Sequence, residues 1–371
     1  MNMSFYRLVD KYRNLNVAEI IENITEDEVV EVINKSRLDI WDFMKLLSPA
    51  GGRQIERMAV KAREESLKHF GKAILLYTPM YISNYCVNRC SYCGFNASNS
   101  IERRLLSLEE IDKEAQNIAK TGLLHILLLT GDAPKLTTMD YLVNSVKVLK
   151  KYFESVVVEI FAMTEKQYGE MIEAGVDGLA IYQETYDEKI YDQVHVSGPK
   201  TDFKFRLDAP ERACKQGIRN VSLGALLGLA DWRKEIFLTG IHGKYLLDNY
   251  PEVEYCFSFP RIKKHVGMKN GCNRIDDRNF VQTILALKLY LPYFGVNITT
   301  RETKELRKNL IPIGITKMSA GVSTEVGGHT NSKDHSGTAQ FDIADHSGVG
   351  DIKKLINECG YQAVFKDWMN I

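Results

Sequence analysis

The stretch Tyr85-Cys86-Val87-Asn88-Arg89-Cys90-Ser91-Tyr92-Cys93-Gly94 decides how the rest of the chain is interpreted. It holds three of the seven cysteines, at the spacing Cys-x3-Cys-x2-Cys, directly after a strand-like run from Ala73 to Ile82. Thiolates are soft ligands that suit iron–sulfur clusters, zinc and copper(I). Most [4Fe–4S] clusters take four cysteines, so three thiolates on one loop would leave one iron open to a small molecule.

A zinc site and three unrelated buried thiols are the alternatives for these cysteines. Zinc sites usually use paired Cys-x2-Cys or Cys/His ligands, and no second pair lies within reach in the sequence. Buried thiols rarely gather in a loop that also carries Asn, Arg and Ser. An iron–sulfur cluster with Cys86, Cys90 and Cys93 as its ligands is therefore the favoured interpretation.

With an aromatic residue, Tyr92, before the last cysteine, the motif resembles the signature of radical S-adenosylmethionine (SAM) enzymes. The longer string Met80-Tyr81-Ile82-Ser83-Asn84-Tyr85-Cys86, with Cys93-Gly94-Phe95, narrows the resemblance to the aromatic amino acid lyases. That family includes the tyrosine lyases of thiamine thiazole biosynthesis (2-iminoacetate synthases) and of hydrogenase maturation. The resemblance extends from about Tyr77 to Phe365-Lys366-Asp367-Trp368. It implies a [4Fe–4S] cluster whose open iron binds the methionine part of SAM.

Composition limits the class of protein. The chain has 371 residues, 44% of them apolar, which is enough for one α/β barrel or two ordinary domains. The net charge of zero leaves no electrostatic footprint for nucleic acid or an anionic membrane. Met1 to Arg13 is not an apolar leader, and the most apolar run, Leu123–Thr130, is too short to span a bilayer. An odd number of cysteines fits a reduced cytosol, so we expect a cytoplasmic enzyme.

Strand-like and helix-like patterns alternate after residue 70. The strand-like runs are Ala73–Asn84, Leu123–Thr130, Val156–Met163, Gly178–Gln183, Asn220–Leu227, Tyr255–Pro260, Asn297–Arg301 and Lys317–Gly321. The helical stretches between them are Ser107–Thr121, Met139–Tyr152, Thr164–Ala174, Phe205–Gln216, Trp232–Asp248, Asp276–Tyr290 and Glu302–Asn309. This alternation predicts a parallel sheet closed into a (β/α)8 barrel of the TIM type, with an open doubly wound sheet as the alternative.

Two regions flank the predicted barrel, which we place at residues 71–322. Residues 1–70 are helical and charged, with helices expected at Asp39–Leu47 and Gln54–His69, so they predict a helical layer packed on the barrel. Residues 323–371 are interpreted as a C-terminal loop and closing segment, in which Ser323–Gly350 could serve as a lid or docking surface.

The remaining histidines and cysteines are not expected to hold metal. The spacing of the tail histidines His329, His335 and His346 fits no metal site. The scattered cysteines are interpreted as structural, namely Cys214, Cys256, Cys272 and Cys359.

Catalytic groups of such a barrel gather at the C-terminal ends of the strands. The second strand ends in Thr130-Gly131-Asp132, which by itself is only a turn. It resembles the Gly-Gly-Glu-type motif that receives the ammonium group of SAM, with the shorter Asp in place of Glu.

After the fourth strand, Gln183 and Glu184 begin a polar string that could equally be a helix start capped by Thr185. It resembles the segment that contacts the ribose and methionine of SAM, which favours both residues as pocket residues. Gly224 and Gly228 resemble the Gly-x-Ile-x-Gly-x-x-Glu segment beside the adenine, where glycine permits close approach of a flat ring.

Arginines end the sixth and seventh strands, at Arg261 and Arg301. A guanidinium at a barrel mouth suits bidentate capture of a carboxylate, although pairing with a helix-start acid such as Glu302 is the alternative. In the aromatic lyases, an Arg of the seventh strand and a Ser of the eighth hold the carboxylate of the substrate. By their positions in the sequence, Arg301 and Ser319 resemble these two residues.

The resemblance implies a tyrosine lyase that forms 2-iminoacetate (dehydroglycine) and p-cresol, with flavodoxin or ferredoxin as electron donor and a thiazole synthase as partner. Two rivals belong to the same family. The hydrogenase-maturation lyase carries further cysteines after the barrel, where this chain has only Cys359, and a tryptophan lyase differs mainly in its pocket. From another class, the chain could be a non-catalytic iron–sulfur carrier or redox sensor.

Overall fold

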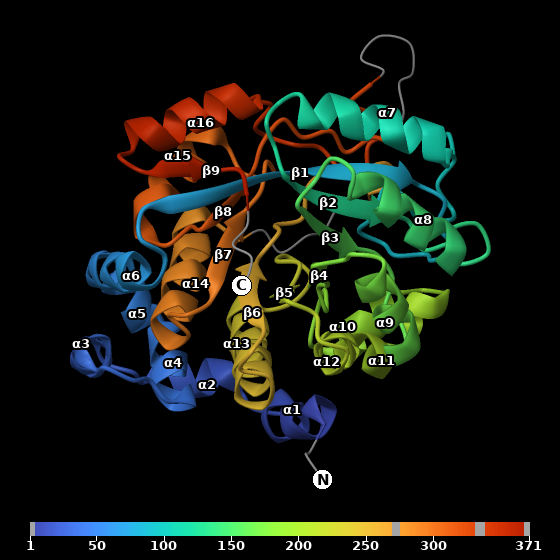
Figure 1. Cartoon of the computed structure of the whole chain (residues 1–371). Coiled ribbons are helices and arrows are strands. Elements are labelled where there is room, and N and C mark those ends of the chain that lie inside the picture. Colours follow the sequence, from blue (N-terminus) through green and yellow to red (C-terminus); the bar gives the residue numbers. More distant parts are fainter. Residues whose placement is uncertain (1–3, 269–274, 331–337, 367–371) are drawn as a thin grey trace.

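The computed structural model describes residues 4–268, 275–330 and 338–366, and its centre is a closed barrel of eight parallel strands surrounded by helices (Figure 1). The strands are β1 (Ala73–Ser83), β2 (His125–Thr130), β3 (Ser155–Glu159), β4 (Gly178–Ala180), β5 (Asn220–Leu223), β6 (Glu254–Ser258), β7 (Gly295–Ile298) and β8 (Lys317–Ser319). They neighbour one another in chain order, and β1 closes the ring by pairing with both β8 and β2. The predicted barrel is confirmed, and the alternative of an open sheet is wrong.

Helices follow the strands around the outside of the barrel. They are α7 (Leu108–Ala119), α8 (Met139–Leu149), α9 (Glu165–Glu173), α10 (Glu188–Val194), α11 (Phe203–Leu207), α12 (Ala209–Lys215), α13 (Trp232–Asn249), α14 (Asp277–Tyr290), α15 (Lys304–Leu310) and α16 (Val349–Glu358). The start of α7 has a capping box, in which the Glu110 backbone N–H donates to Ser107 Oγ at 3.2 Å and the Ser107 N–H donates to Glu110 at 2.8 Å. The single helix expected over Phe205–Gln216 is wrong, because α11 ends at Leu207 and α12 starts anew with Pro210 in its first turn.

A ninth strand, β9 (Gln362–Val364), was missed by the sequence analysis. It pairs in parallel with the first residues of β1, so that Leu75 has Lys317 of β8 as one partner and Val364 as another. Just after β9, the carbonyl of Phe365 also accepts a hydrogen bond at 3.1 Å from the backbone N–H of Leu124, which directly precedes β2. The closing segment therefore lies at the N-terminal end of the barrel, and a strand of three residues is too short to show a pattern in the sequence.

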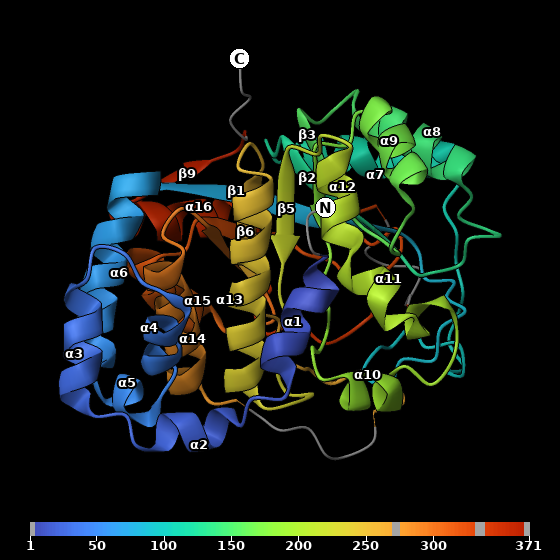
Figure 2. The same ribbon diagram turned by 90° about the horizontal axis from the view of Figure 1, so that it is seen from below.

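The N-terminal helices form the expected layer. They are α1 (Phe5–Arg13), α2 (Val17–Glu22), α3 (Glu26–Asn34), α4 (Ile40–Leu46), α5 (Pro49–Arg53) and α6 (Ile55–Phe70). They lie along α13 and α14 on one side of the barrel (Figure 2). Phe5 stacks on His242 with ring centroids 3.9 Å apart, and Phe43 stacks on Tyr290 at 4.5 Å. The apolar side chains of this layer and of the barrel form one continuous core.

Some residues singled out in the sequence fall outside the described residues, namely Cys272, His335 and the Asp367-Trp368 end of the closing segment. In the described part of Ser323–Gly350 there is no strand, and the helix α16 begins at its end, at Val349. No helix among residues 4–268, 275–330 and 338–366 is long and apolar enough to cross a membrane.

Gly240 allows α4 to pack closely on α13. A Cβ atom at Gly240 would lie 2.4 Å from Cε1 of the Phe43 ring, so the ring would have to move away from its stacked neighbours. We expect Gly240→Ala to destabilise the protein by about 1–3 kcal/mol, the usual effect of overpacking a core. The measurement is thermal unfolding followed by circular dichroism.

The matched control is Gly350→Ala in α16, where no atom lies within 4 Å of the new methyl group. Because alanine favours a helix, this variant should unfold at the wild-type temperature or slightly above it. Equal unfolding temperatures for the two variants would contradict the packing argument.

Candidate active site

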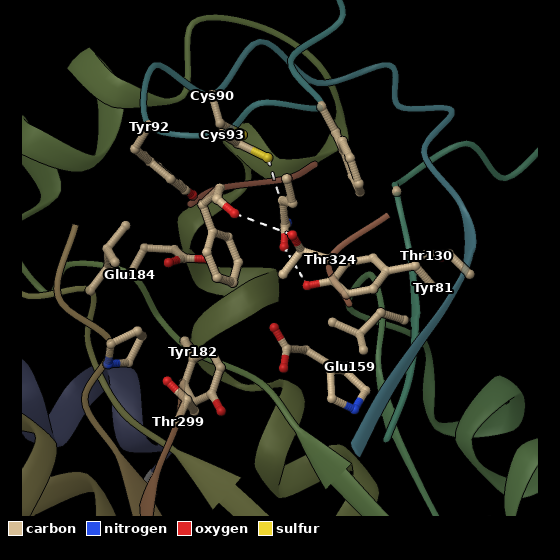
Figure 3. A pocket seen from close by; sticks show the side chains of 18 of the residues that line it. Tyr81, Cys90, Tyr92, Cys93, Thr130, Glu159, Tyr182, Glu184, Thr299 and Thr324 are labelled. Carbon is tan, nitrogen blue, oxygen red and sulfur yellow. Dashed lines mark hydrogen bonds between the residues drawn. The ribbon is translucent and has the colours of Figure 1, made fainter. Parts of the chain in front are cut away.

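One cavity opens at the C-terminal ends of the barrel strands, and the cysteine loop forms one end of it (Figure 3). Ten residues singled out in the sequence line this cavity: Cys86, Cys90, Tyr92, Cys93, Thr130, Gly131, Asp132, Glu184, Arg301 and Ser319. Gln183, Gly224 and Gly228 are not among its lining residues. Side chains that follow β1, β2, β4, β7 and β8 in the sequence thus meet in one place.

The cysteine loop is fixed by pairing with the segment after α10. Arg89 N–H donates to the Ser197 carbonyl at 2.9 Å, Ser91 N–H donates to the Val194 carbonyl at 2.9 Å, and Cys90 bridges His195. The loop has neither helix nor strand structure of its own, so these backbone hydrogen bonds hold the three cysteines in place.

Tyr92 is oriented by a buried histidine. Its hydroxyl lies 2.6 Å from Nε2 of His195, while Nδ1 of His195 lies 2.8 Å from the Tyr191 carbonyl. A carbonyl can only accept, so Nδ1 carries the proton and Nε2 accepts from Tyr92. Burial, with the nearby charge of Lys200, lowers the pKa of His195 to about 3, so this histidine is neutral.

The turn after β2 carries unpaired polar atoms beside the cysteines. Asn88 donates to one carboxylate oxygen of Asp132 at 2.6 Å, but the other oxygen and the Thr130 hydroxyl are buried without a partner among the described residues. Burial raises the pKa of Asp132. Gly131 is required for close approach, since a Cβ there would lie 2.2 Å from the Tyr85 carbonyl oxygen.

Glu184 is held in an unusual backbone conformation. Among the described residues it is the one non-glycine residue with a positive φ, at 71°. Its carboxylate accepts from Nζ of Lys200 at 2.6 Å and lies 3.4 Å from Arg206. Burial disfavours its charge, yet these two cations bring the pKa of Glu184 below its ordinary value. The helix-start alternative does not apply to Thr185, because Asp187 caps α10 and Thr185 donates to buried Glu235.

The three predicted residues outside the lining have other surroundings. Gln183 is buried, and neither its side-chain oxygen nor its nitrogen has a partner among the described residues. Gly224 lies against β6, where a Cβ would meet the Ser258 carbonyl oxygen at 1.8 Å. Gly228 has a φ of 115°, a conformation that L-residues rarely adopt. The two glycines therefore shape the segment after β5 through its backbone.

The two strand-end arginines have different partners. Arg261 pairs with Glu302, at 3.0 Å from Nε, and with Asp277 at 2.7 Å. Arg301 lines the cavity, donates to the Arg261 carbonyl at 3.3 Å, and lies over the ring of Phe341 at 3.3 Å from the centroid. Among the described residues it has no acidic partner within ion-pair distance. Glu302, the acid considered as a partner of Arg301, thus pairs with Arg261.

Ser319 lies at the end of β8 beside Arg301. Its Oγ accepts from the backbone N–H of Thr300 at 3.1 Å, which leaves the hydroxyl hydrogen able to donate into the cavity. Its carbonyl accepts from the fully buried Arg307, which also pairs with Asp345.

The C-terminal loop lines part of the cavity. Gln340 accepts from the Tyr81 hydroxyl at 2.8 Å, its amide nitrogen lies 3.7 Å from Sγ of Cys93, and its carbonyl accepts from Gly94 N–H at 3.2 Å. Phe341 follows and contacts Arg301. This loop therefore contributes side chains to the site, whereas the sequence analysis had named none of its residues for the site.

Glu159, which sequence analysis did not single out, also lines the cavity. It ends β3, and its carboxylate points into the cavity between Tyr81 and Tyr182 (Figure 3). Burial and the charge of Glu184 raise its pKa to about 7, against the opposing influence of Arg301. An acid at the end of a run of valines was the available signal, because catalytic groups of such a barrel gather at the ends of its strands. Lys200 and Arg206 were missed as well, since neither follows a strand.

The cavity suits a cluster and a ligand with an ammonium group. The three thiols line it together, and burial raises the pKa of Cys90 to about 12 and also raises that of Cys93. Such thiols ionise when a metal binds them. No three His, Cys, Asp or Glu side chains in the described part of the chain lie close enough together to hold a single metal ion. The partnerless oxygens of Thr130 and Asp132 fit an ammonium ligand.

Comparison with known proteins agrees with this geometry. Residues 80–237 match the family model of the radical SAM superfamily, and residues 258–362 match the biotin and thiamin synthesis associated domain. The 2-iminoacetate synthase of Salmonella typhimurium (strain LT2) is 35% identical over 363 residues, which cover 97% of this chain and 96% of that protein.

Solved structures share the fold. The [FeFe]-hydrogenase maturase HydG superimposes with a TM-score of 0.90 at 28% identity, covering 96% of this chain and 80% of that chain. Methylornithine synthase (PylB) superimposes with a TM-score of 0.71 at 22% identity, covering 91% of this chain and 97% of that chain, which shows a common fold. Because it is 35% identical over nearly its full length to a 2-iminoacetate synthase and carries the superfamily's domain over its cysteine motif, this chain belongs to the aromatic amino acid lyase family of the radical SAM superfamily.

Proposed function

We propose that this chain is a radical SAM tyrosine lyase of the 2-iminoacetate synthase type. It cleaves the Cα–Cβ bond of L-tyrosine to give 2-iminoacetate and p-cresol, with methionine and 5′-deoxyadenosine as co-products. The observation that carries the proposal is one cavity that joins three cysteines to an arginine without an acidic partner among the described residues, in a chain 35% identical to such a synthase.

The cysteine end of the cavity would hold the cofactors. Cys86, Cys90 and Cys93 are the proposed ligands of a [4Fe–4S] cluster, and the free oxygens of Asp132 and Thr130 would receive the ammonium group of SAM. When bound, the cluster and SAM would supply radical chemistry that abstracts a hydrogen atom from the amino group of the substrate.

Other predicted residues would shape the SAM site from its sides. Tyr92 and Glu184 line the cavity and would contact SAM directly. Gln183, with both amide atoms unpaired among the described residues, and the backbone at Gly224 and Gly228 would support it from outside the lining.

Arg301 and Ser319 would hold the carboxylate of tyrosine. The guanidinium lines the cavity with its planar fork free of described acids, and the Ser319 hydroxyl can donate beside it. The loop residues Gln340 and Phe341 would keep water from the site.

The setting of the reaction follows from its chemistry. We assign residues 1–70 to the helical layer, 71–322 to the barrel and 323–371 to the loop and closing segment.

A reduced cluster needs an electron donor, and we propose flavodoxin or ferredoxin in the cytoplasm. The reactive imine product would pass to a thiazole synthase.

The first test of the proposed function concerns the cluster. Replacing Cys86, Cys90 or Cys93 by Ala should abolish SAM cleavage by the reconstituted protein, because two thiolates cannot hold a site-differentiated cluster. Cys214→Ala and Cys359→Ala are the controls and should keep both the visible absorption of the cluster and SAM cleavage, since neither thiol lines the cavity. Loss of the cluster in Cys359→Ala would contradict the assignment.

A second prediction concerns capture of the substrate. Arg301→Lys keeps the charge but loses the planar fork, so kcat/KM for tyrosine should fall about 10- to 100-fold while SAM affinity stays within about twofold. Ser319→Ala should have a smaller effect on tyrosine but should also lower stability, because it leaves the Thr300 N–H unpaired.

Arg261→Lys is the matched control, because its guanidinium is already bound by Glu302 and Asp277. It should lower kcat/KM for tyrosine by less than Arg301→Lys does. Tyrosine kinetics equal to wild type in Arg301→Lys would show that Arg301 does not bind the substrate.

The third prediction separates the family members. Turnover with tyrosine should release p-cresol together with glyoxylate, the hydrolysis product of 2-iminoacetate, and no carbon monoxide. Carbon monoxide trapped by a haem protein in proportion to p-cresol would assign the chain to the hydrogenase-maturation type. Turnover of tryptophan in preference to tyrosine would make it a tryptophan lyase, and an absence of SAM cleavage would leave an iron–sulfur carrier or sensor.

A further inference from the structure

The cavity holds a carboxylate that none of the assigned roles uses. Glu159 projects from the end of β3 between Tyr81 and Tyr182, at the side of the cavity away from the cysteines (Figure 3). In the described part of the chain it accepts no hydrogen bond, and the cations near it act on it only through their field.

The walls around Glu159 favour an aromatic ligand. Leu127 and Leu129 of β2 line the same cavity, and Leu129 is the register partner of Glu159 in the sheet. The rings of Tyr81 and Tyr182 stand on either side of the carboxylate. A carboxylate enclosed in this way is costly without a hydrogen-bond donor, so its place in the cavity wall points to a donor brought by a ligand.

The position of Glu159 relative to Arg301 indicates which part of the ligand it meets. Both residues line one cavity and influence each other's charge, but neither reaches the other as an ion pair. With the carboxylate of tyrosine on Arg301 and its amino group toward the cysteines, the side chain is left to point away from the cysteines. The phenol hydroxyl is the far end of that side chain.

We propose that Glu159 accepts a hydrogen bond from the phenol hydroxyl of tyrosine and thereby selects tyrosine over phenylalanine. This inference rests on the proposed function and names the specificity residue of the same site. A site built to bind a hydroxyl rejects an analogue that lacks it, because the carboxylate in the cavity is then left unpaired.

The test measures binding and not turnover. Reconstituted protein with its cluster and SAM, kept without reductant, is titrated anaerobically with L-tyrosine and with L-phenylalanine in a calorimeter. Wild type should prefer tyrosine. Glu159→Leu should bind tyrosine about 10- to 100-fold more weakly, the loss expected for a hydrogen bond to a charged group, and phenylalanine no more weakly than wild type. Glu159→Gln, which keeps an acceptor oxygen without the charge, should fall between the two.

Asp208→Asn is the matched control. Asp208 is a partly buried acid whose pKa burial also raises, but it lies at the junction of α11 and α12 and does not line the cavity. It should leave both affinities unchanged. SAM affinity, measured in the same samples, reports whether each variant is folded.

The outcomes separate the two proposals. A parallel loss of tyrosine and phenylalanine binding in Glu159→Leu, or no loss of either, would overturn the assignment of Glu159 while leaving the lyase proposal standing. A wild-type protein that binds SAM but not tyrosine would overturn the proposed function itself, and the inference with it.

Discussion

The buried ion pairs of Glu184 hold the cysteine end of the cavity together. A φ of 71° at a glutamate costs about 1–3 kcal/mol, and such strain persists only where the surroundings fix it. Here the Leu226 N–H donates to the Glu184 carbonyl at 2.8 Å, and Lys200 donates to its carboxylate. Lys200 also donates its backbone N–H to Asn88 Oδ1 at 3.0 Å. One carboxylate therefore connects the loop after β4 with the loop that carries the cysteines.

This connection also affects the thiols. Burial raises the pKa of Cys90, while the charge of Lys200 acts in the opposite direction and favours the thiolate. Lys200 and Arg206 both pair with the carboxylate of Glu184. The two cations near the cysteines therefore have an acidic partner. A cluster with three thiolates adds negative charge at this end, where the nearby cations stabilise it.

The sequence revealed those parts of the site that depend on local pattern. Asp132, Arg301 and Ser319 could be found because each lies at or just after the end of a predicted strand, where the family resemblance gave it a role. Lys200 and Gln340 could not be found in this way. Lys200 contacts Glu184, which lies 16 residues away in the sequence, and Gln340 contacts Cys93, which lies 247 residues away. Such contacts leave no periodic pattern in the sequence. Glu159 also lies at the end of a strand, but it was missed because no other polar residue or motif adjoins it in the sequence.

The arginines at the barrel mouth differ in their partners. Two are paired with acids and stabilise the fold, and a third is available to a ligand. Arg261 and Arg307 each have an acid, Glu302 and Asp345, and both pairs tie neighbouring elements together. Arg301 has the Phe341 ring, and a cation–π contact of about 0.5–2 kcal/mol offsets only part of the cost of burying a charge.

Arg301 and Glu159 thus carry opposite charges in one cavity without pairing with each other. A direct ion pair would close the space between them. Their separation instead suits a ligand with a carboxylate at one end and a hydrogen-bond donor at the other, joined by an aromatic ring that the leucine and tyrosine walls can enclose. Tyrosine has these three features in that order, so the same charges that make the empty cavity costly favour its binding.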